Sequence, residues 1–345
     1  VTTRGGKVEG GASYSYLGLG RPVLSLAANQ RYESGGQLLG GDAPNQDTLL
    51  VLERSRDVDA SITFAAPKWR YNLAVTLGAG FIWENRELWG TNLQPTSSYS
   101  LNRPTSRLTD ARVALNFNSS RSHAFQMGTA RGLNLFVQGR VQNEIQLPDS
   151  LQSVTGVDRS LVEVVGRARG AIPLWGGGYA SHVLAVQASG GVADGPGAGV
   201  FQYRVGGASG QQEQLTGLEL FGGGFILFPV RGYASGGRFG RFAWSATAEY
   251  RFPLWFINRG FRAWPVHADR VMGSLFFDAG NAWGPDVSPS GFQNALRDPL
   301  ASVGAEVTAE MLGLYDVQLR LRLGAAVPLV EGDGVVGYVR VGLPF

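Results

Sequence analysis

The chain lacks several features that mark common protein classes. Its 345 residues include no cysteine, and only 17% of them are charged, against about 25% in an ordinary soluble domain. No run of about 18 apolar residues occurs, which excludes a transmembrane helix. The absence of cysteine is compatible with an oxidising cell envelope, where a stray thiol is a liability. Residues 1–6 hold no apolar signal-peptide core, so we expect a mature chain or the C-terminal piece of a longer one.

Motifs for catalysis and for cofactor binding are also missing. The three histidines, His123, His182 and His267, are scattered, and none lies at metal-ligand spacing from another ligand-type residue. The sequence contains neither a G-x-S-x-G nucleophile elbow nor a phosphate-binding loop. The net charge of +3 comes without a clustered basic stripe, which argues against nucleic acid as a partner. We therefore expect no enzyme activity, no cofactor and no metal.

Apolar and polar residues alternate along much of the chain, most clearly at its C-terminus. Apolar side chains occupy every second position on one face of a predicted strand, namely Val339, Val341, Leu343 and Phe345. A soluble strand has no need to end the polypeptide on such a Phe, whereas a barrel strand meets lipid and an aromatic interfacial girdle. This strand resembles the C-terminal assembly signal of bacterial outer-membrane β-barrels, which here comprises Tyr338, Val341, Leu343 and Phe345.

Four longer segments repeat the same two-residue period: Tyr71–Trp83, Leu133–Glu144, Phe242–Leu254 and Tyr315–Leu329. Soluble strands usually have about 5–6 residues, whereas spanning a bilayer at a tilt takes about 9–11. Weaker matches are found near residues 9–18, 22–33, 47–55, 57–66, 108–118, 160–171, 181–194, 269–283 and 298–310. Together these segments predict an all-β fold, a transmembrane antiparallel up-and-down β-barrel. It would form one domain over residues 1–345, with about 14 to 16 strands.

The charged side chains of these segments define the inside of the predicted barrel. An Arg or Lys that faces lipid at mid-membrane costs about 2–4 kcal/mol, so the charged face must line a hydrated lumen. The predicted lumen residues are Glu84, Arg112, Gln138, Arg140, Glu163, Arg167, Arg169, Glu249, Arg251, Asp278, Arg320, Arg322 and Arg340. The predicted lipid-facing residues include Val75, Val137, Leu319, Leu321 and Leu323.

The predicted connections alternate in length. Pro67-Lys68 is typical of a short periplasmic turn, whereas residues 88–106 and 147–158 are longer polar stretches that we expect as outer loops. The longest connection, residues 195–240, is rich in glycine and contains Val230-Arg231-Gly232-Tyr233. A loop of this length in a compact fold is usually functional or disordered. Taken alone, the Arg-Gly-aromatic tetrapeptide also fits a solvated loop tip.

Two carboxylates of the predicted lumen follow this loop in the chain. Glu249 lies in the next strand, and Asp278 alternates with the apolar Phe277 and Ala279 in the strand after that. An arginine on a loop that folds into the lumen would find both acids. A charge-assisted, bidentate pair is strong when it is partly desolvated. Such a pair would hold the loop inside the barrel.

These residues resemble the C-terminal barrel of the BamA-like surface-antigen superfamily, which includes outer-membrane protein insertases and two-partner-secretion transporters. The resemblance is best over residues 180–345, and it rests on Phe201–Gly207, Val230–Tyr233, Glu249 and Phe277–Gly280 in that order. It implies that the long loop folds into the lumen, where Arg231 pairs with Glu249 and Asp278. The implied loop tether comprises Arg231, Gly232, Tyr233, Glu249, Asp278 and Gly280.

The resemblance also implies a function. We expect a barrel of the bacterial outer membrane that inserts or exports polypeptides without a covalent step. Its expected partners are outer-membrane lipid and lipopolysaccharide, a polypeptide substrate, and complex partners in the periplasm or the outer membrane. Family members usually carry periplasmic transport-associated domains before the barrel, and we expect none within residues 1–345. The alternatives are a passive pore that favours anions, because the lumen has a surplus of Arg, and a membrane anchor for a larger fusion protein or complex.

Overall fold

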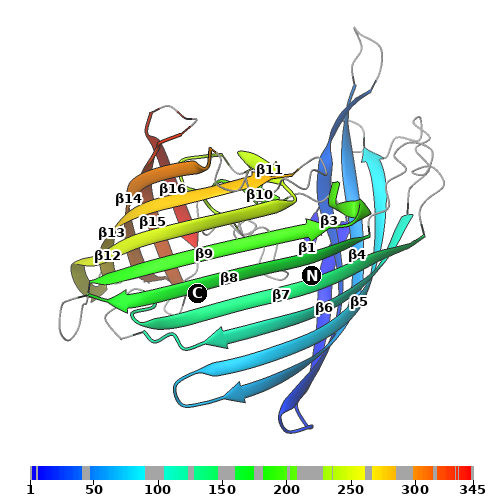
Figure 1. Ribbon diagram of the computed structural model, residues 1–345, viewed down its shortest axis with the longest axis horizontal. Coiled ribbons are helices and arrows are strands. Elements are labelled where there is room, and N and C mark those ends of the chain that lie inside the picture. Colours follow the sequence, from blue (N-terminus) through cyan, green and yellow to red (C-terminus); the bar gives the residue numbers. More distant parts are fainter. Residues whose placement is uncertain are drawn as a thin grey trace.

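The protein is a long antiparallel sheet that curls around a central space, as the computed structural model shows (Figure 1). The structure describes the chain apart from residues 1, 5–6, 41–46, 90–104, 123–127, 147–159, 175–181, 200–202, 208–227, 235, 261–265, 285–297, 314–316, 331, 333 and 343–345. Most of the predicted outer loops at 88–106 and 147–158 therefore lie outside the described residues.

Fourteen strands form the sheet, in the order β1 to β9 followed by β12 to β16. They are β1 (Thr2–Arg4), β2 (Lys7–Tyr16), β3 (Pro22–Gly40), β4 (Asp47–Pro67), β5 (Asn72–Trp89), β6 (Thr105–Asn118), β7 (Gly132–Gln146), β8 (Leu161–Pro173), β9 (Val183–Asp194), β12 (Phe242–Gly260), β13 (Val266–Trp283), β14 (Leu300–Gly313), β15 (Val317–Pro328) and β16 (Val336–Gly342). Each strand is antiparallel to its neighbours, as the up-and-down prediction requires. The two edges of the curled sheet are β1–β2 and β16.

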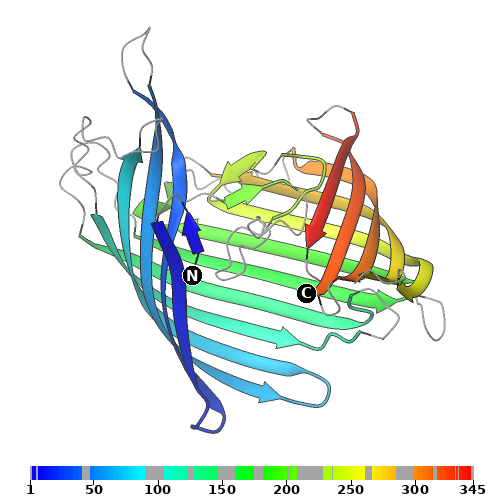
Figure 2. The same cartoon turned by 180° about the vertical axis from the view of Figure 1, so that it is seen from behind.

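A smaller ribbon interrupts this order between β9 and β12. It consists of β10 (Tyr203–Val205) paired with β11 (Arg238–Gly240), after the short helix η1 (Pro196–Gly199). Figure 2 shows the ribbon on the concave side of the sheet. Among the described residues, no helix is long and apolar enough to cross a membrane.

The two faces of the sheet differ as the alternation predicts. On β13, the side chains of Leu275 and Phe277 are 52% and 45% exposed on the convex face, while Asp278 beside them is 1% exposed on the concave face. On the concave face, Arg112 forms an ion pair with Asp59 at 2.5 Å, and Arg140 pairs with Asp110. Apolar residues outside and paired charges inside are the arrangement of a transmembrane barrel. The fold class is therefore confirmed.

Some of the predicted lumen residues cannot be placed. The side chains of Glu84 and Arg340 lie outside the part that the structure describes, although both residues belong to strands.

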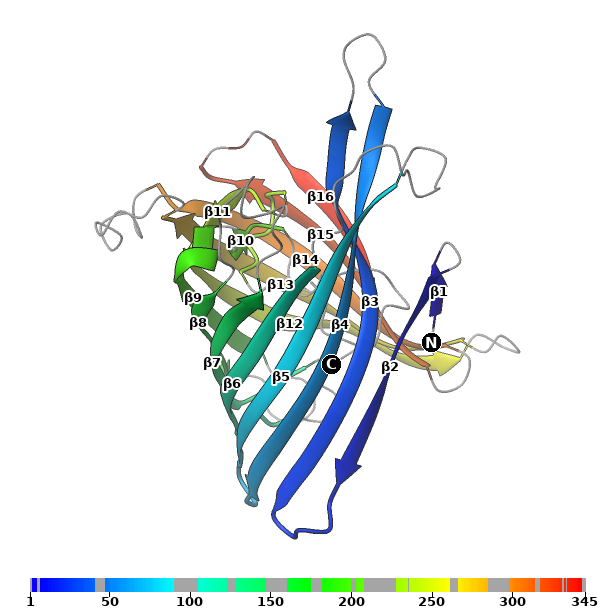
Figure 3. The same ribbon diagram turned by 90° about the vertical axis from the view of Figure 1, so that its right-hand side faces the viewer.

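One strand prediction is wrong. Residues 47–55 and 57–66 were expected as two strands, but they form the single strand β4 of 21 residues. The two ranges are weak matches to the alternation, and the boundaries of strands are poorly defined by sequence. Arg56 donates a hydrogen bond to Gln30 at 2.6 Å on the outer face of β3. Arg56 pairs in register with Trp83 on β5, an aromatic residue of the kind that marks the membrane interface. Figure 3 shows β3 and β4 projecting past the other strands.

The sheet has 14 strands, within the expected range of 14 to 16, although the individual strands differ from the predicted ones. Merging the two segments removes one predicted strand, and β1, which has three residues, adds one. β1 pairs with β2 from Thr2↔Glu9 to Arg4↔Lys7. Three residues carry too little periodicity to be detected from sequence.

We predict that Leu323→Cys resists a membrane-impermeant thiol reagent in intact membranes, while Arg322→Cys reacts. The two side chains are neighbours on β15, but Leu323 is 48% exposed on the convex, apolar face. The natural chain has no cysteine, so it provides a background without signal. Equal labelling of both variants would contradict the assignment of the faces.

Candidate functional site

The long loop folds onto the inner wall of the barrel through an apolar core. Tyr203, Val205, Phe228 and Val230 of the loop are each at most 4% exposed. They pack with Val165, Ala193, Ala243, Ala282 and Leu300, which belong to β8, β9, β12, β13 and β14. Isolated bridges join Val205 to Phe228 and Gly207 to Val230. The two described ends of the loop, 203–207 and 228–234, therefore form one compact unit, which we call the loop seat.

Arg231 anchors this unit to β13. Its guanidinium donates two hydrogen bonds to Asp278, from Nε to Oδ2 at 2.7 Å and from Nη2 to Oδ1 at 2.8 Å. The backbone N–H of Arg231 donates a third, to Oδ2 at 3.1 Å. Both side chains are 1% exposed. A bidentate Arg–carboxylate pair fixes orientation as well as distance, because two parallel bonds allow only one geometry.

Two more acids and an aromatic ring complete the surroundings of Arg231. Its Nη1 lies 3.6 Å from Glu249 on β12 and 3.9 Å from Glu306 on β14. Its guanidinium carbon lies 3.3 Å from the ring centroid of Phe276, a favourable position for a cation over an aromatic face. Burial by itself would lower the pKa of Arg231. The hydrogen bonds and the charge of Asp278 outweigh burial, so the pKa is raised above its usual value.

The residues after Arg231 fix the loop to two further strands. Gly232 has a φ of 90°, which a residue with a side chain rarely adopts. A Cβ there would also lie only 3.1 Å from Ala326 on β15. The Tyr233 hydroxyl donates to the carbonyl of Ala301 on β14 at 2.8 Å, and it also contacts the carbonyl of Val330. The tetrapeptide thus contacts β13, β14 and β15 together.

Gly280 makes room for the loop seat. A Cβ at this position on β13 would lie 2.8 Å from a methyl carbon of Val230 and 2.9 Å from the carbonyl oxygen of Trp244. Contacts below 3.0 Å require a neighbour to move, and here one of the two neighbours is backbone. Glycine lets the loop approach the sheet this closely.

A second attachment lies on the other side of the loop seat. The Tyr203 hydroxyl donates a hydrogen bond to Glu163 on β8 at 3.0 Å. Burial and the negative charge of Glu163 both raise the pKa of Tyr203, so the phenol stays protonated and remains a donor. The loop seat is therefore bonded to β8 at one side and to β13 and β14 at the other.

The predicted C-terminal signal is described only in part. The Tyr338 hydroxyl donates to Glu306 at 2.9 Å, so this side chain faces the lumen and contacts a neighbour of Arg231. Val341 belongs to β16, but its side chain lies outside the described part, as do Leu343 and Phe345. The role of this segment in assembly stays a prediction.

The structure thus brings Arg231, Glu249, Asp278 and Gly280 together at one place in the lumen, with Gly232 and Tyr233 beside them. The sequence argument missed Glu306, Phe276 and the Tyr203–Glu163 bond. Glu306 could have been found, because it alternates with Ala305 and Val307 on β14. The contact with Phe276 carries no comparable signal, because it depends on the path of the loop. Among the residues that the structure describes, no group of three or more His, Cys, Asp or Glu side chains has an arrangement that could hold a metal ion.

The sequence matches no protein-family model and no curated protein. Solved structures nevertheless share its fold. CdiB from Escherichia coli aligns over 97% of this chain and 52% of its own, with a TM-score of 0.56 and 13% identity. CdiB from Acinetobacter baumannii aligns over 96% and 49%, with a TM-score of 0.52 and 11% identity. The chain has the fold of the CdiB barrel. It spans about half the length of these two CdiB chains.

BamA from Haemophilus ducreyi lacking POTRA domains 1–3 also aligns with the chain. The match covers 96% of this chain and 69% of that one, with a TM-score of 0.47 and 14% identity. The likeness to CdiB confirms the barrel that the resemblance in sequence implied. At 11–13% identity, the similarity to CdiB establishes the fold alone. The roles of individual residues are inferred from the geometry described above.

We predict that Arg231→Ala releases the loop seat while the barrel remains folded. Removing one partner of a buried pair costs about 3–5 kcal/mol, because the remaining charge is left uncompensated. Hydrogen exchange of the amides in 228–233 should rise, and the electrophoretic shift of the folded barrel on heating should persist. Arg231→Lys should restore protection only in part, because lysine lacks the planar fork.

Arg204→Ala is the matched control for this experiment. Arg204 lies in the same loop, on β10, but its side chain is exposed. Exchange in 228–233 should stay at the level of the natural chain. If Arg231→Ala also leaves exchange unchanged, the tether is refuted.

We predict that Gly280→Ala displaces the loop seat through overpacking, which typically costs about 1–3 kcal/mol. The same amides in 228–233 should lose protection. Val230→Ala in the Gly280→Ala background should restore it in part, because it removes the loop methyl nearest to the new Cβ and leaves the contacts with Val205 and the Trp244 carbonyl. Gly190→Ala on β9 is the control, since a Cβ there has no atom within 4 Å.

Proposed function

We propose that this protein is an outer-membrane barrel of the BamA-like superfamily that inserts or exports polypeptides. The observation that carries the proposal is the loop seat. In a barrel with the CdiB fold, a buried Arg231 holds a long loop against three wall strands. A loop bonded to the wall in this way narrows the lumen and braces it. The proposal includes the bacterial outer membrane as the location, and lipid, lipopolysaccharide and a polypeptide as partners.

The edge of the sheet supports the same proposal. The described residues of β16 pair with β15 alone, from Arg320↔Gly342 to Ala326↔Val336. An edge strand offers unpaired N–H and C=O groups to another extended chain. Gly337 and Gly342 weaken this strand further, since glycine within a strand provides no side chain for packing. A substrate strand could add there by β-augmentation.

A passive pore is the second candidate, and the arginines of the lumen favour it. Arg167, Arg169, Arg251, Arg320 and Arg322 all lie on inward faces, and such rings of cations select anions. The loop seat argues against a wide open channel, because it fills part of the lumen. The anchor of a larger protein remains a third candidate, to which the structure adds nothing specific.

Proteoliposomes can test the main proposal. We predict that vesicles with the protein fold a small, urea-unfolded outer-membrane barrel severalfold faster than empty vesicles, or take up an unfolded polypeptide into a protease-protected state. Arg231→Ala should lose most of this effect, whereas Arg204→Ala should keep it.

Planar-bilayer recording separates the second candidate. A stable, open conductance with anion preference, together with no effect on folding or uptake, would favour the passive pore. Brief openings that lengthen in Arg231→Ala fit a lumen that the loop obstructs.

A further inference from the structure

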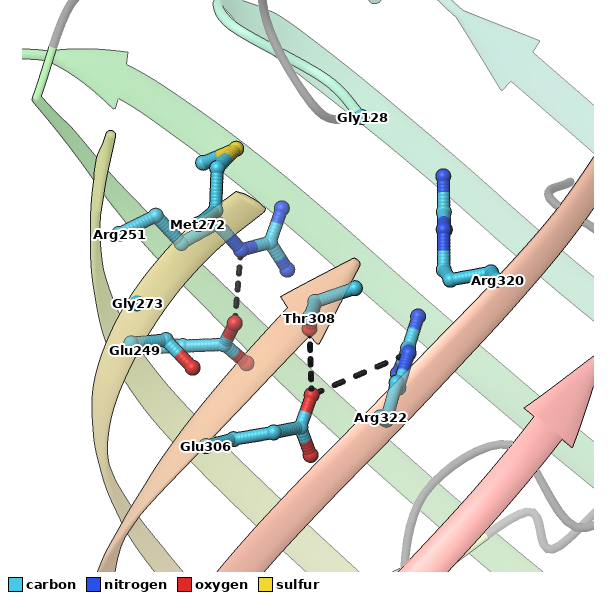
Figure 4. Close-up of a pocket in the computed structure, with 10 residues that line it drawn as sticks. Gly128, Glu249, Arg251, Met272, Gly273, Glu306, Thr308, Arg320 and Arg322 are labelled. Carbon is cyan, nitrogen blue, oxygen red and sulfur yellow. Dashed lines mark hydrogen bonds and ion pairs between the residues drawn. The ribbon is translucent and has the colours of Figure 1, made fainter. Parts of the chain in front are cut away.

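A separate pocket lies beside the loop seat, toward the short turns of the barrel. Its cavity volume is about 60 Å³, well above the roughly 10–15 Å³ that one water molecule needs. Its walls come from β12, β13, β14 and β15, and Gly128 of the β6–β7 connection borders it. Figure 4 shows Arg251 on one side, Arg320 and Arg322 on the other, and Thr308 between them.

Positive charge exceeds negative charge around this pocket. Three arginines line it, Arg251, Arg320 and Arg322, against two carboxylates, Glu249 and Glu306. Both acids are also within 4 Å of Arg231, so they are shared with the loop seat. Arg169 on β8 is near enough to repel Arg251 and Arg322. Glu310 also pairs with Arg320 at 2.5 Å, so the excess of positive charge is small. In a confined space such an excess attracts an anion.

Two buried donors in the pocket lack an acceptor among the described residues. The hydroxyl of Ser274 is unpaired, and its residue is only 6% exposed on the inner face of β13. The Nε of Arg320 is likewise unpaired, although its Nη2 donates to Glu310 at 2.5 Å. A buried donor without an acceptor is unfavourable, because it has lost its hydrogen bonds to water. Both donors line the same space, where one acceptor group could satisfy them.

We propose that this pocket binds an oxyanion, a phosphate or a carboxylate, between Arg251, Arg320, Arg322 and the Ser274 hydroxyl. Guanidinium groups bind such planar or tetrahedral oxygens through charge-assisted hydrogen bonds. The oxyanion could come from a free anion in the lumen or from an acidic side chain of a polypeptide. The inference does not depend on polypeptide export, because it concerns the binding chemistry of the pocket.

Calorimetric titration of the full chain in detergent micelles tests the site. The two probes are inorganic phosphate and a hexaglutamate peptide, at constant ionic strength, with hexaglutamine as the neutral reference. We expect saturable binding of at least one anionic probe and none of hexaglutamine. Binding of phosphate alone identifies a free anion as the source, and binding of hexaglutamate alone identifies acidic side chains.

Two variants locate the site without leaving a buried acid unpaired. Arg322→Gln keeps Glu306 bonded to Tyr338 and Thr308, and Ser274→Ala removes a hydroxyl that has no partner. Each should weaken binding at least about tenfold, because each removes a hydrogen bond to the charged ligand. Arg56→Gln on the outer face changes the net charge equally and should leave affinity unchanged.

Three results would overturn the proposal. The first is no saturable binding of either anionic probe. The second is equal affinity in Arg322→Gln, Ser274→Ala and Arg56→Gln. The third is equal binding of hexaglutamate and hexaglutamine, because it would show that charge is not what the pocket recognises.

Discussion

Charge cannot face hydrocarbon, and this constraint organises the whole chain. Every strand that crosses the bilayer must turn its arginines and acids toward the lumen, where they need partners in a confined space. On β4, β6 and β7 they find one another, as in the pairs Arg112–Asp59 and Arg140–Asp110. On β12 to β15 they also pair with one another, as in Arg251–Glu249 and Arg320–Glu310. Glu249, Asp278 and Glu306 in addition receive Arg231 from the loop. The lumen face is therefore lined by linked ion pairs, whereas the face toward lipid is apolar.

The loop seat shows how a loop can be held inside such an interior. An apolar core removes water, and Arg231 then meets three acids from three neighbouring strands. Low exposure strengthens each charge interaction and penalises any arrangement that leaves one unpaired. Gly232 and Gly280 supply the close approach that this geometry requires. Tyr203 bonds the opposite side of the loop to β8, so the loop is braced across several strands of the wall.

The loop seat and the arginine-lined pocket share Glu249 and Glu306. Both acids lie within 4 Å of Arg231, and they also face Arg251 and Arg322 respectively. A group that binds at one place therefore changes the charge at the other. Coupling of this kind is reciprocal for binding free energies.

The sequence by itself determined the barrel, its two faces and the inward direction of Glu249 and Asp278, because a two-residue period leaves each side chain only one of two faces. It also singled out Arg231, through a resemblance rather than through periodicity. It did not determine that β4 is one strand, in which Arg56 lies on the outer face beside Gln30 of β3 and in register with Trp83 of β5. Only the tertiary structure decided that Glu306, Phe276 and Ser274 lie near Arg231 or its neighbours. Those contacts depend on strand register and on the path of the loop, which bring together residues far apart in the chain, and local alternation contains no information about either.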